Sequence, residues 1–168
     1  KNFMNLMEQH YFLIQIMFPE TAPEDKQLNL TEDDYRFLYG KMSLLPRESK
    51  YPLYEDNDHY YDGYCKFFMF GNTKERIPDH IRIYNKVGLA HGFLVDNAYV
   101  VDVKNKLEFF LSAVVYVNQN ETLNDNTYEY DEISIPFLAA LGNAVYDYEL
   151  SRKRDIKPNL DRFSLHKK

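Results

Sequence analysis

The residues of this chain best suited to chemistry lie together in one segment, Ile81-Arg82-Ile83-Tyr84-Asn85-Lys86-Val87-Gly88-Leu89-Ala90-His91-Gly92. Within it, Lys86, Val87 and Gly88 form a Lys-x-Gly triplet, and His91 follows. The lysine supplies positive charge, and the glycine, which has no side chain, lets a strand backbone come close to an acyl group. A triplet of this kind could form one wall of a substrate site. Taken by itself, it fits better a charged strand end followed by a turn glycine.

The strand that must position this triplet is indicated by the alternation of Ile81 and Ile83 after a proline. Two apolar runs follow, Phe93 to Val103 and Leu107 to Val117, separated by a short polar turn. This pattern predicts an antiparallel hairpin, with Tyr84 to Gly88 in a strand beside its first arm.

The last of these strands is apolar on both faces, which predicts helices on both sides of the sheet. One face carries Leu107, Phe109, Leu111, Ala113, Val115 and Val117, and the other carries Phe110, Val114 and Tyr116. The fold class expected from this pattern is α+β, with an antiparallel sheet of at least three strands flanked by helices.

The clearest helix signal runs from Thr31 to Leu45 and stops at Pro46. Thr31 is a natural N-cap, and Asp34 lies at the position of a capping box. The apolar stripe expected to be buried is Tyr35, Leu38, Tyr39, Met42 and Leu45.

Three further segments also favour helices. The first covers about residues 3–18, although Phe12 to Met17 also fits a strand. The second runs from about Asp58 to Phe70, with Gly71 as its stop. The third runs from about Ser134 to Arg152 and tolerates a proline in its first turn. The stripe expected to face the sheet from this last helix is Ile133, Phe137, Leu141, Val145 and Tyr148.

This order of elements resembles the C-terminal half of the serine β-lactamase and penicillin-binding-protein superfamily, in which a Lys-x-Gly triplet closes one wall of the site. More closely, the chain resembles an uncharacterised group of β-lactamase-like serine hydrolases from Bacteroidetes-type bacteria. The resemblance covers nearly the whole chain. It is carried by Phe18-Pro19-Glu20-Thr21-Ala22-Pro23, Asn85-Lys86-Val87-Gly88, Glu108-Phe109, Val117-Asn118 and Tyr128-Glu129-Tyr130-Asp131.

The resemblance implies a substrate wall made of Lys86, Val87 and Gly88, with His91 facing the cleft or standing in an exposed turn. It also implies a small-molecule or peptidoglycan-like acyl substrate, no cofactor, and a periplasmic or secreted, envelope-associated parent. Val87 replaces the hydroxyl residue that is usual in the family. Because valine has no hydroxyl, the hydrogen-bond donor expected to hold a substrate carboxylate is missing. This puts β-lactam recognition in doubt.

The nucleophile of this family stands in a Ser-x-x-Lys motif at the start of a helix. Here the one Ser-x-x-Lys is Ser164 to Lys167, in a basic, turn-rich tail, and Ser-Asp-Asn does not occur. We therefore expect a fragment whose full-length parent uses acyl-enzyme chemistry and which lacks the nucleophile itself. The alternative is a β-lactamase-like domain without catalysis that serves as a binding or envelope-structural module.

Glu20 could be a remnant of the loop that carries a general-base glutamate in one class of β-lactamases. A solvated acidic loop is the simpler interpretation, because residues 19–30 hold two prolines and three acids.

The 168 residues suit one domain, which we place at residues 1–150, followed by a basic tail at 151–168. The net charge of -6 argues against a general nucleic-acid binder. Cys65, the single cysteine, is expected to be a small buried hydrophobe rather than a nucleophile. The histidines lack metal-ligand spacing, and no apolar run reaches the length of a transmembrane helix.

Overall fold

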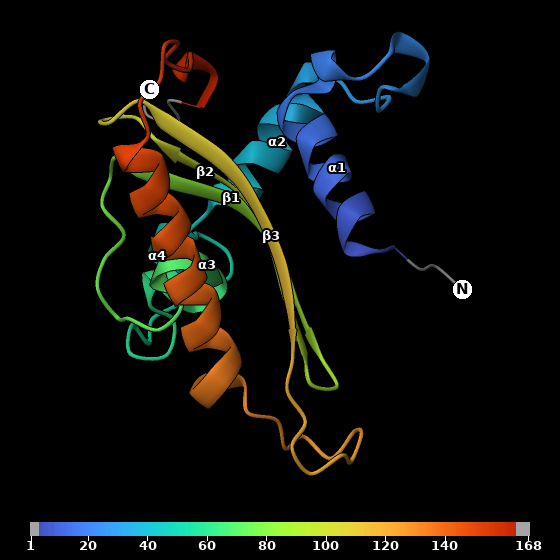
Figure 1. Ribbon diagram of the computed structural model, residues 1–168, viewed down its shortest axis with the longest axis vertical. Helices are drawn as coiled ribbons and strands as arrows, with labels where there is room; N and C mark the ends of the chain where they lie inside the picture. The colour runs from blue at the N-terminus through green and yellow to red at the C-terminus, as the bar shows by residue number, and fades with distance from the viewer. Residues whose placement is uncertain (1–3, 164–168) are drawn as a thin grey trace.

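The computed structural model describes residues 4–163 and has an α+β fold. Its centre is one antiparallel sheet in the order β1-β2-β3, with α1 and α2 on one face and α3 and α4 on the other (Figure 1). Among these described residues, no helix is both long and apolar enough to cross a membrane. The elements are α1 (Leu6–Met17), α2 (Glu32–Ser43), α3 (Phe67–Phe70), β1 (Ile81–Ala90), β2 (Phe93–Asp102), β3 (Leu107–Tyr116) and α4 (Ile135–Ser151).

The predicted hairpin and the strand beside it are confirmed. Each strand has ten residues and pairs with its neighbour along its whole length, so that Ile81 lies opposite Asp102 and Asp102 lies opposite Leu107. The turn between β2 and β3 is held by the Asp102 carboxylate, which accepts from the backbone N–H groups of Lys104 and Asn105 at 2.9 and 3.0 Å.

Two apolar layers cover the two faces of the sheet, as the double apolar pattern of the last strand predicts. The layer under α3 and α4 includes Leu107 and Phe109, with Leu111 packed against it, which confirms the expected contact with the last helix. The layer under α1 and α2 is rich in aromatic rings. Its buried members are Leu13, Ile16, Met17, Tyr39, Tyr84, Tyr99, Val101, Leu160 and Phe163.

The helix predicted at Thr31 is confirmed together with its capping box. The Thr31 hydroxyl accepts from the backbone N–H of Asp34, and the Asp34 carboxylate accepts from the backbone N–H of Thr31. The first segment is a helix rather than a strand. It begins with a capping box of its own, formed by Asn5 and Glu8.

The predicted helix from Asp58 to Phe70 is wrong. The structure has a 3-10 turn at Asp62–Cys65 and then the single turn of α3, inside which Met69 has a φ of 69°. Tertiary contacts override the local pattern here. The Asp62 carboxylate binds the Arg47 guanidinium at 2.9 Å and the backbone N–H of Ile77 at 2.9 Å, so the segment is anchored to two distant loops.

The stripe predicted for the last helix is confirmed in part. Leu141 and Val145 pack against the layer under α3 and α4. Ile133, Phe137 and Tyr148 are at least half exposed, and the buried residues of α4 are Leu138, Ala139 and Gly142. The reason is the close packing of α3 on α4. A Cβ at Gly142 would lie 2.5 Å from the Met69 nitrogen, so this glycine, rather than a larger apolar side chain, faces the neighbouring segment.

Part of the segment that was expected to be a basic tail after the domain packs into the molecule. Leu160 and Phe163 are buried in the aromatic layer, and the Tyr84 hydroxyl donates to the Phe163 carbonyl at 3.2 Å. Two basic side chains of this segment form ion pairs, Arg162 with Glu20 and Arg154 with Glu149.

Candidate functional site

The predicted triplet lies on β1, which is an edge strand of the sheet. The Lys86 side chain is exposed, and its Nζ donates to the Val87 carbonyl at 2.5 Å. Because successive side chains of a strand alternate, Lys86 and Gly88 belong to the face under α1 and α2. Val87 belongs to the opposite face and packs against the layer under α3 and α4.

Gly88 has a packing role in addition to any contact with a ligand. It lies directly opposite Val95 of β2, and a Cβ at Gly88 would come within 2.9 Å of the Val95 Cγ1. The valine therefore occupies the space that a side chain at position 88 would need. On this face, the missing side chain of Gly88 makes room for Val95 of the neighbouring strand.

His91 and Gly92 form the two-residue turn that joins β1 to β2. Both have positive φ, 50° and 86°, which is the geometry of the tight turns that connect antiparallel strands. His91 is exposed. Of the two roles open from the sequence, this position favours the turn.

Glu20 is not brought to the triplet. It lies in a 3-10 turn, Pro19–Thr21, after α1, and its Oε1 is 2.7 Å from the Arg162 Nη2. This hydrogen-bonded ion pair lowers the pKa of Glu20, which makes the carboxylate a weaker base. Figure 1 shows the end of α1 and the β1–β2 turn at opposite ends of the molecule. The proposed general base and the proposed wall are thus separate features.

A polar row that the sequence did not reveal crosses the sheet at Lys86. Asn97 of β2 lies opposite Lys86, and Ser112 of β3 lies opposite Asn97, so all three share the face under α1. From α1, the His10 Nδ1 lies 2.7 Å from the Ser112 Oγ. A serine bonded to a histidine is the arrangement of an activated nucleophile, and its hydrogen-bond pattern decides whether it is one.

The pattern shows that Ser112 is not activated by His10. The Asn97 amide nitrogen donates to the Gln9 carbonyl at 2.7 Å, which turns the amide oxygen towards Ser112. That oxygen carries no hydrogen, so the Ser112 hydroxyl must donate to it across 2.5 Å, and the imidazole must then donate to the serine. The row ties α1 to the sheet and leaves no basic nitrogen to accept the serine proton.

A second feature missed from the sequence is a buried network on the other face, made by Lys66, Asn85 and Asp96. The Lys66 Nζ donates to the Asn85 Oδ1 and to the Met42 carbonyl, each at 2.6 Å. Asn85 donates through its Nδ2 to the Asp96 Oδ1 at 2.9 Å. The other oxygen of Asp96 accepts from the backbone N–H groups of Phe67 and Phe68 at 3.1 and 3.3 Å.

This network fixes α3 against the strand that carries the triplet, because Asn85 directly precedes Lys86. Both charged members are shifted towards their neutral forms. Burial lowers the pKa of Lys66 to about 8, and burial raises the pKa of Asp96 to about 6 although its hydrogen bonds oppose this. The available sequence signal was a charged residue inside an apolar run, Tyr64 to Phe70 for Lys66 and Phe93 to Val101 for Asp96.

Asp96 should make the protein less stable as the pH rises. Its pKa in the folded state, about 6, exceeds the ordinary 3.8, so the folded protein binds this proton more tightly than the unfolded chain. The contribution is complete below pH 3.8 and is lost as the pH rises through about 6. The whole shift corresponds to about 3 kcal/mol. Urea unfolding should show the wild type losing up to this amount relative to Asp96→Asn between pH 4 and pH 7. A difference that is independent of pH would contradict the assignment.

A cavity of about 880 Å³ adjoins the Val87 side of β1. Residues of the segment before α3, of the loop after it and of the start of α4 line the cavity, together with Val87 and Leu89. Cys65 is one of the lining residues and is exposed, so the expectation that it is a buried hydrophobe is wrong. Surrounding atoms nevertheless desolvate its sulfur and raise the pKa of the thiol, which therefore stays protonated at neutral pH.

Within residues 4–163, no group of three or more His, Cys, Asp or Glu side chains could hold a metal ion. No protein-family model, curated protein or solved structure matches this chain. The structure by itself shows a three-stranded antiparallel sheet packed between helices.

Proposed function

We propose that this chain is the C-terminal part of a β-lactamase-like serine hydrolase, in which the Lys86 end of β1 forms one wall of an acyl-binding site. The observation that carries the proposal is the position of the triplet on an edge strand. The outer side of such a strand presents backbone N–H and C=O groups without a strand partner, and a substrate amide or ester can pair with them. The exposed Lys86 ammonium lies on the same stretch of the strand.

The order of elements supports the same proposal. A strand that carries Lys-x-Gly, a long antiparallel hairpin and a closing helix packed on the sheet follow one another, as the resemblance to the superfamily leads us to expect. In this proposal the nucleophilic serine belongs to a segment of the parent before Lys1. The substrate is a small-molecule or peptidoglycan-like acyl compound, and the parent is a periplasmic or secreted, envelope-associated protein.

In the proposed site Lys86 supplies positive charge to an anionic group or to a developing oxyanion. Its Nζ, which bonds to the Val87 carbonyl in this structure, would turn to the substrate. Val87 offers no hydroxyl, so a substrate carboxylate gains no hydrogen bond at this position. The proposal therefore favours acyl substrates without a carboxylate beside the scissile bond.

The 168-residue chain should form no covalent adduct with acylating ester or β-lactam probes, because its described serines lack an activating base. Ser43, Ser49 and Ser134 are buried, and Ser112 receives a hydrogen bond from His10 instead of giving one. The exposed Ser151 donates its hydroxyl to the Tyr148 carbonyl at 2.9 Å, not to a base. Intact-mass spectrometry after incubation should show the unmodified mass only. An adduct on any of these serines, or on Ser164 outside the described residues, would contradict the proposal that the nucleophile belongs to another segment of the parent.

A non-catalytic binding or envelope-structural module is the second candidate. Two observations favour it: the Lys86 Nζ is bonded to a carbonyl of its own strand, and Val95 fills the space beside Gly88. The two candidates are separated by the parent protein. A single adduct on a serine before Lys1 supports the hydrolase, and a parent without any reactive serine supports the module.

A further inference from the structure

We infer that the cavity beside Val87 is a binding site for an uncharged aromatic group. This deepens the proposed function, on which it partly rests, because it names the class of substrate group that would lie next to the triplet. Its volume, about 880 Å³, lies within the range of sites that hold small organic ligands. Ligand binding to the cavity can be measured without any reaction, so this inference can be tested apart from catalysis.

The walls of the cavity are aromatic and aliphatic. Tyr61, Tyr64 and Phe67 contribute rings from the segment around the 3-10 turn, and His59 lies with its ring centroid 5.7 Å from that of Tyr64. Across from them, Val87 contributes a branched apolar side chain from β1. Aromatic rings prefer offset or edge-to-face contacts with other rings, so a flat ring is the ligand shape that such walls favour.

Some of the polar groups that line the cavity are already engaged, and others are held in their neutral form. The Tyr61 hydroxyl donates to the Gly71 carbonyl at 2.8 Å, so this residue offers its ring and has no free proton to donate. Burial and the nearby Asp131 carboxylate raise the pKa of Tyr61, which keeps the phenol neutral. The Cys65 thiol is protonated at neutral pH for the reason given above.

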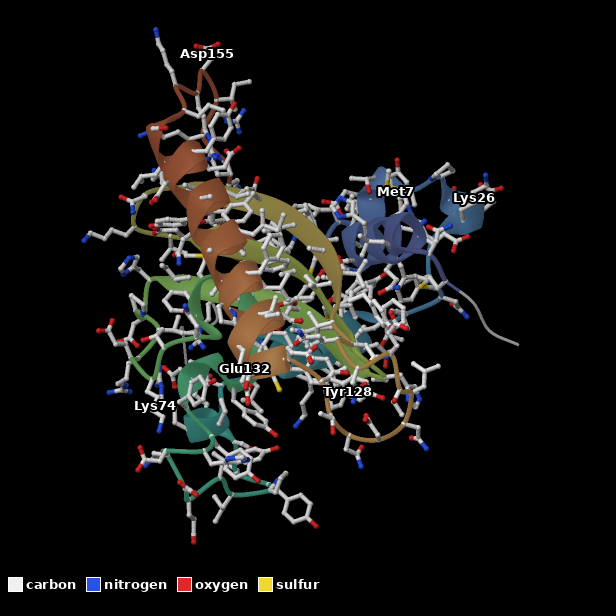
Figure 2. All side chains as sticks on the ribbon, turned by 60° about the horizontal axis from the view of Figure 1, so that its bottom comes forward. Met7, Lys26, Lys74, Tyr128, Glu132 and Asp155 are labelled. Carbon is white, nitrogen blue, oxygen red and sulfur yellow. The ribbon has the colours of Figure 1, made fainter. Side chains whose placement is uncertain are left out.

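The charges at the rim do not favour an anion. Lys74 is the cation that lines the cavity, and its Nζ already lies 3.3 Å from the Asp58 Oδ1. Asp131 adds a negative charge at the start of the segment leading into α4. Figure 2 labels Lys74 on the loop after α3 and Glu132 next to Asp131, on the two segments that border the cavity. With its cation paired and a carboxylate present, the site should prefer a neutral ring over a carboxylate of the same shape.

A matched pair of probes, benzamide and benzoate, tests this inference on the 168-residue chain. Titration followed by NMR should show benzamide binding with a Kd on the order of 1 mM, the range expected for so small a ligand. Benzoate should bind at least about tenfold more weakly, a difference of about 1.4 kcal/mol. Equal affinities, or tighter binding of benzoate, would overturn the preference for a neutral group.

Two further measurements locate the binding. Cys65 is the single cysteine, so iodoacetamide at alkaline pH, where the thiol ionises, labels one position in the cavity. Saturating benzamide should slow that labelling several-fold. Tyr64→Ala should weaken benzamide binding about 2- to 10-fold, the value of an aromatic contact. Tyr51→Ala, a change at a tyrosine that is 91% exposed and does not line the cavity, is the control and should leave the affinity unchanged.

The outcomes separate this inference from the proposed function. Unchanged labelling, or loss of affinity in Tyr51→Ala alone, would overturn the assignment of the cavity even if the parent is acylated. Benzamide binding with the expected preference would support the cavity even if the parent has no reactive serine, and the chain would then be a binding module. The probe comparison and the labelling need no variant, so a misfolded Tyr64→Ala would not remove the test.

Discussion

Replacing Asp96 with alanine should lower the free energy of unfolding by about 3–5 kcal/mol, the cost of breaking a buried ion network by removing one member. Asp96 is completely buried and accepts hydrogen bonds from Asn85 and from the backbone N–H groups of Phe67 and Phe68. Alanine leaves these three donors without their acceptor. It also removes the carboxylate that most favours the charged form of Lys66, a side chain that is only 4% exposed.

Urea unfolding at pH 7 measures this effect, and Asp25→Ala is the control. Asp25 is exposed in the loop before α2, so its replacement should change the free energy of unfolding by less than about 0.5 kcal/mol. The double variant Lys66→Met/Asp96→Ala should lose less than the sum of the two single variants, because the remaining charge is removed as well. Strict additivity, or a loss below about 1 kcal/mol for Asp96→Ala, would show that the network contributes little to stability.

The sheet could be predicted from the sequence because its signal is local. The alternation of Ile81 and Ile83 and the two long apolar runs indicate the three strands, and the short polar turn between the runs makes the last two an antiparallel hairpin. The capping box of Thr31 and Asp34 is equally local, because its two members lie within one helical turn. Contacts between residues that are this close in the sequence can be recognised from a single sequence.

The region before β1 could not be predicted, because distant residues decide its conformation. The run Tyr64 to Phe70 fits a helix by its spacing. In the structure the Phe67 and Phe68 N–H groups bond to Asp96, some thirty residues later, and Asp62 is held by Arg47. Phe163 is a second example. Its ring packs beside Tyr84 and Tyr99, which are far away in the sequence, so no local pattern predicts this contact.

The candidate site also has a part that could be predicted from the sequence and a part that could not. Lys86, Val87 and Gly88 were found because they are consecutive, and the strand pattern placed them on a sheet. Lys66, Asn85 and Asp96 come together from three elements, so their spacing in the sequence carries no signal. The cavity was missed for the same reason, because its lining residues come from segments far apart in the sequence.

If the chain belongs to the proposed hydrolase, Lys86→Ala in the full-length protein should reduce turnover of an acyl substrate by about 100- to 1000-fold. Loss of a preorganised electrostatic contact to a developing oxyanion costs roughly 2.7–4 kcal/mol of barrier. The melting temperature should stay nearly unchanged, because the Lys86 side chain is exposed and its Nζ bonds only to the carbonyl of the next residue. Steady-state kinetics and thermal unfolding of the same preparation measure both quantities.

Lys104→Ala is the matched control for this prediction. Lys104 is also exposed and lies in the turn between β2 and β3, where its backbone N–H rather than its side chain bonds to Asp102. Its replacement should change neither turnover nor stability. The module candidate predicts that Lys86→Ala leaves any residual hydrolysis unaltered. A Lys86→Ala protein that loses stability and activity together would assign Lys86 to the structure of the strand, and the acyl-site role would have to be abandoned. Since Gly88 is already explained by its contact with Val95, the lysine is the residue of the triplet on which the hydrolase proposal depends.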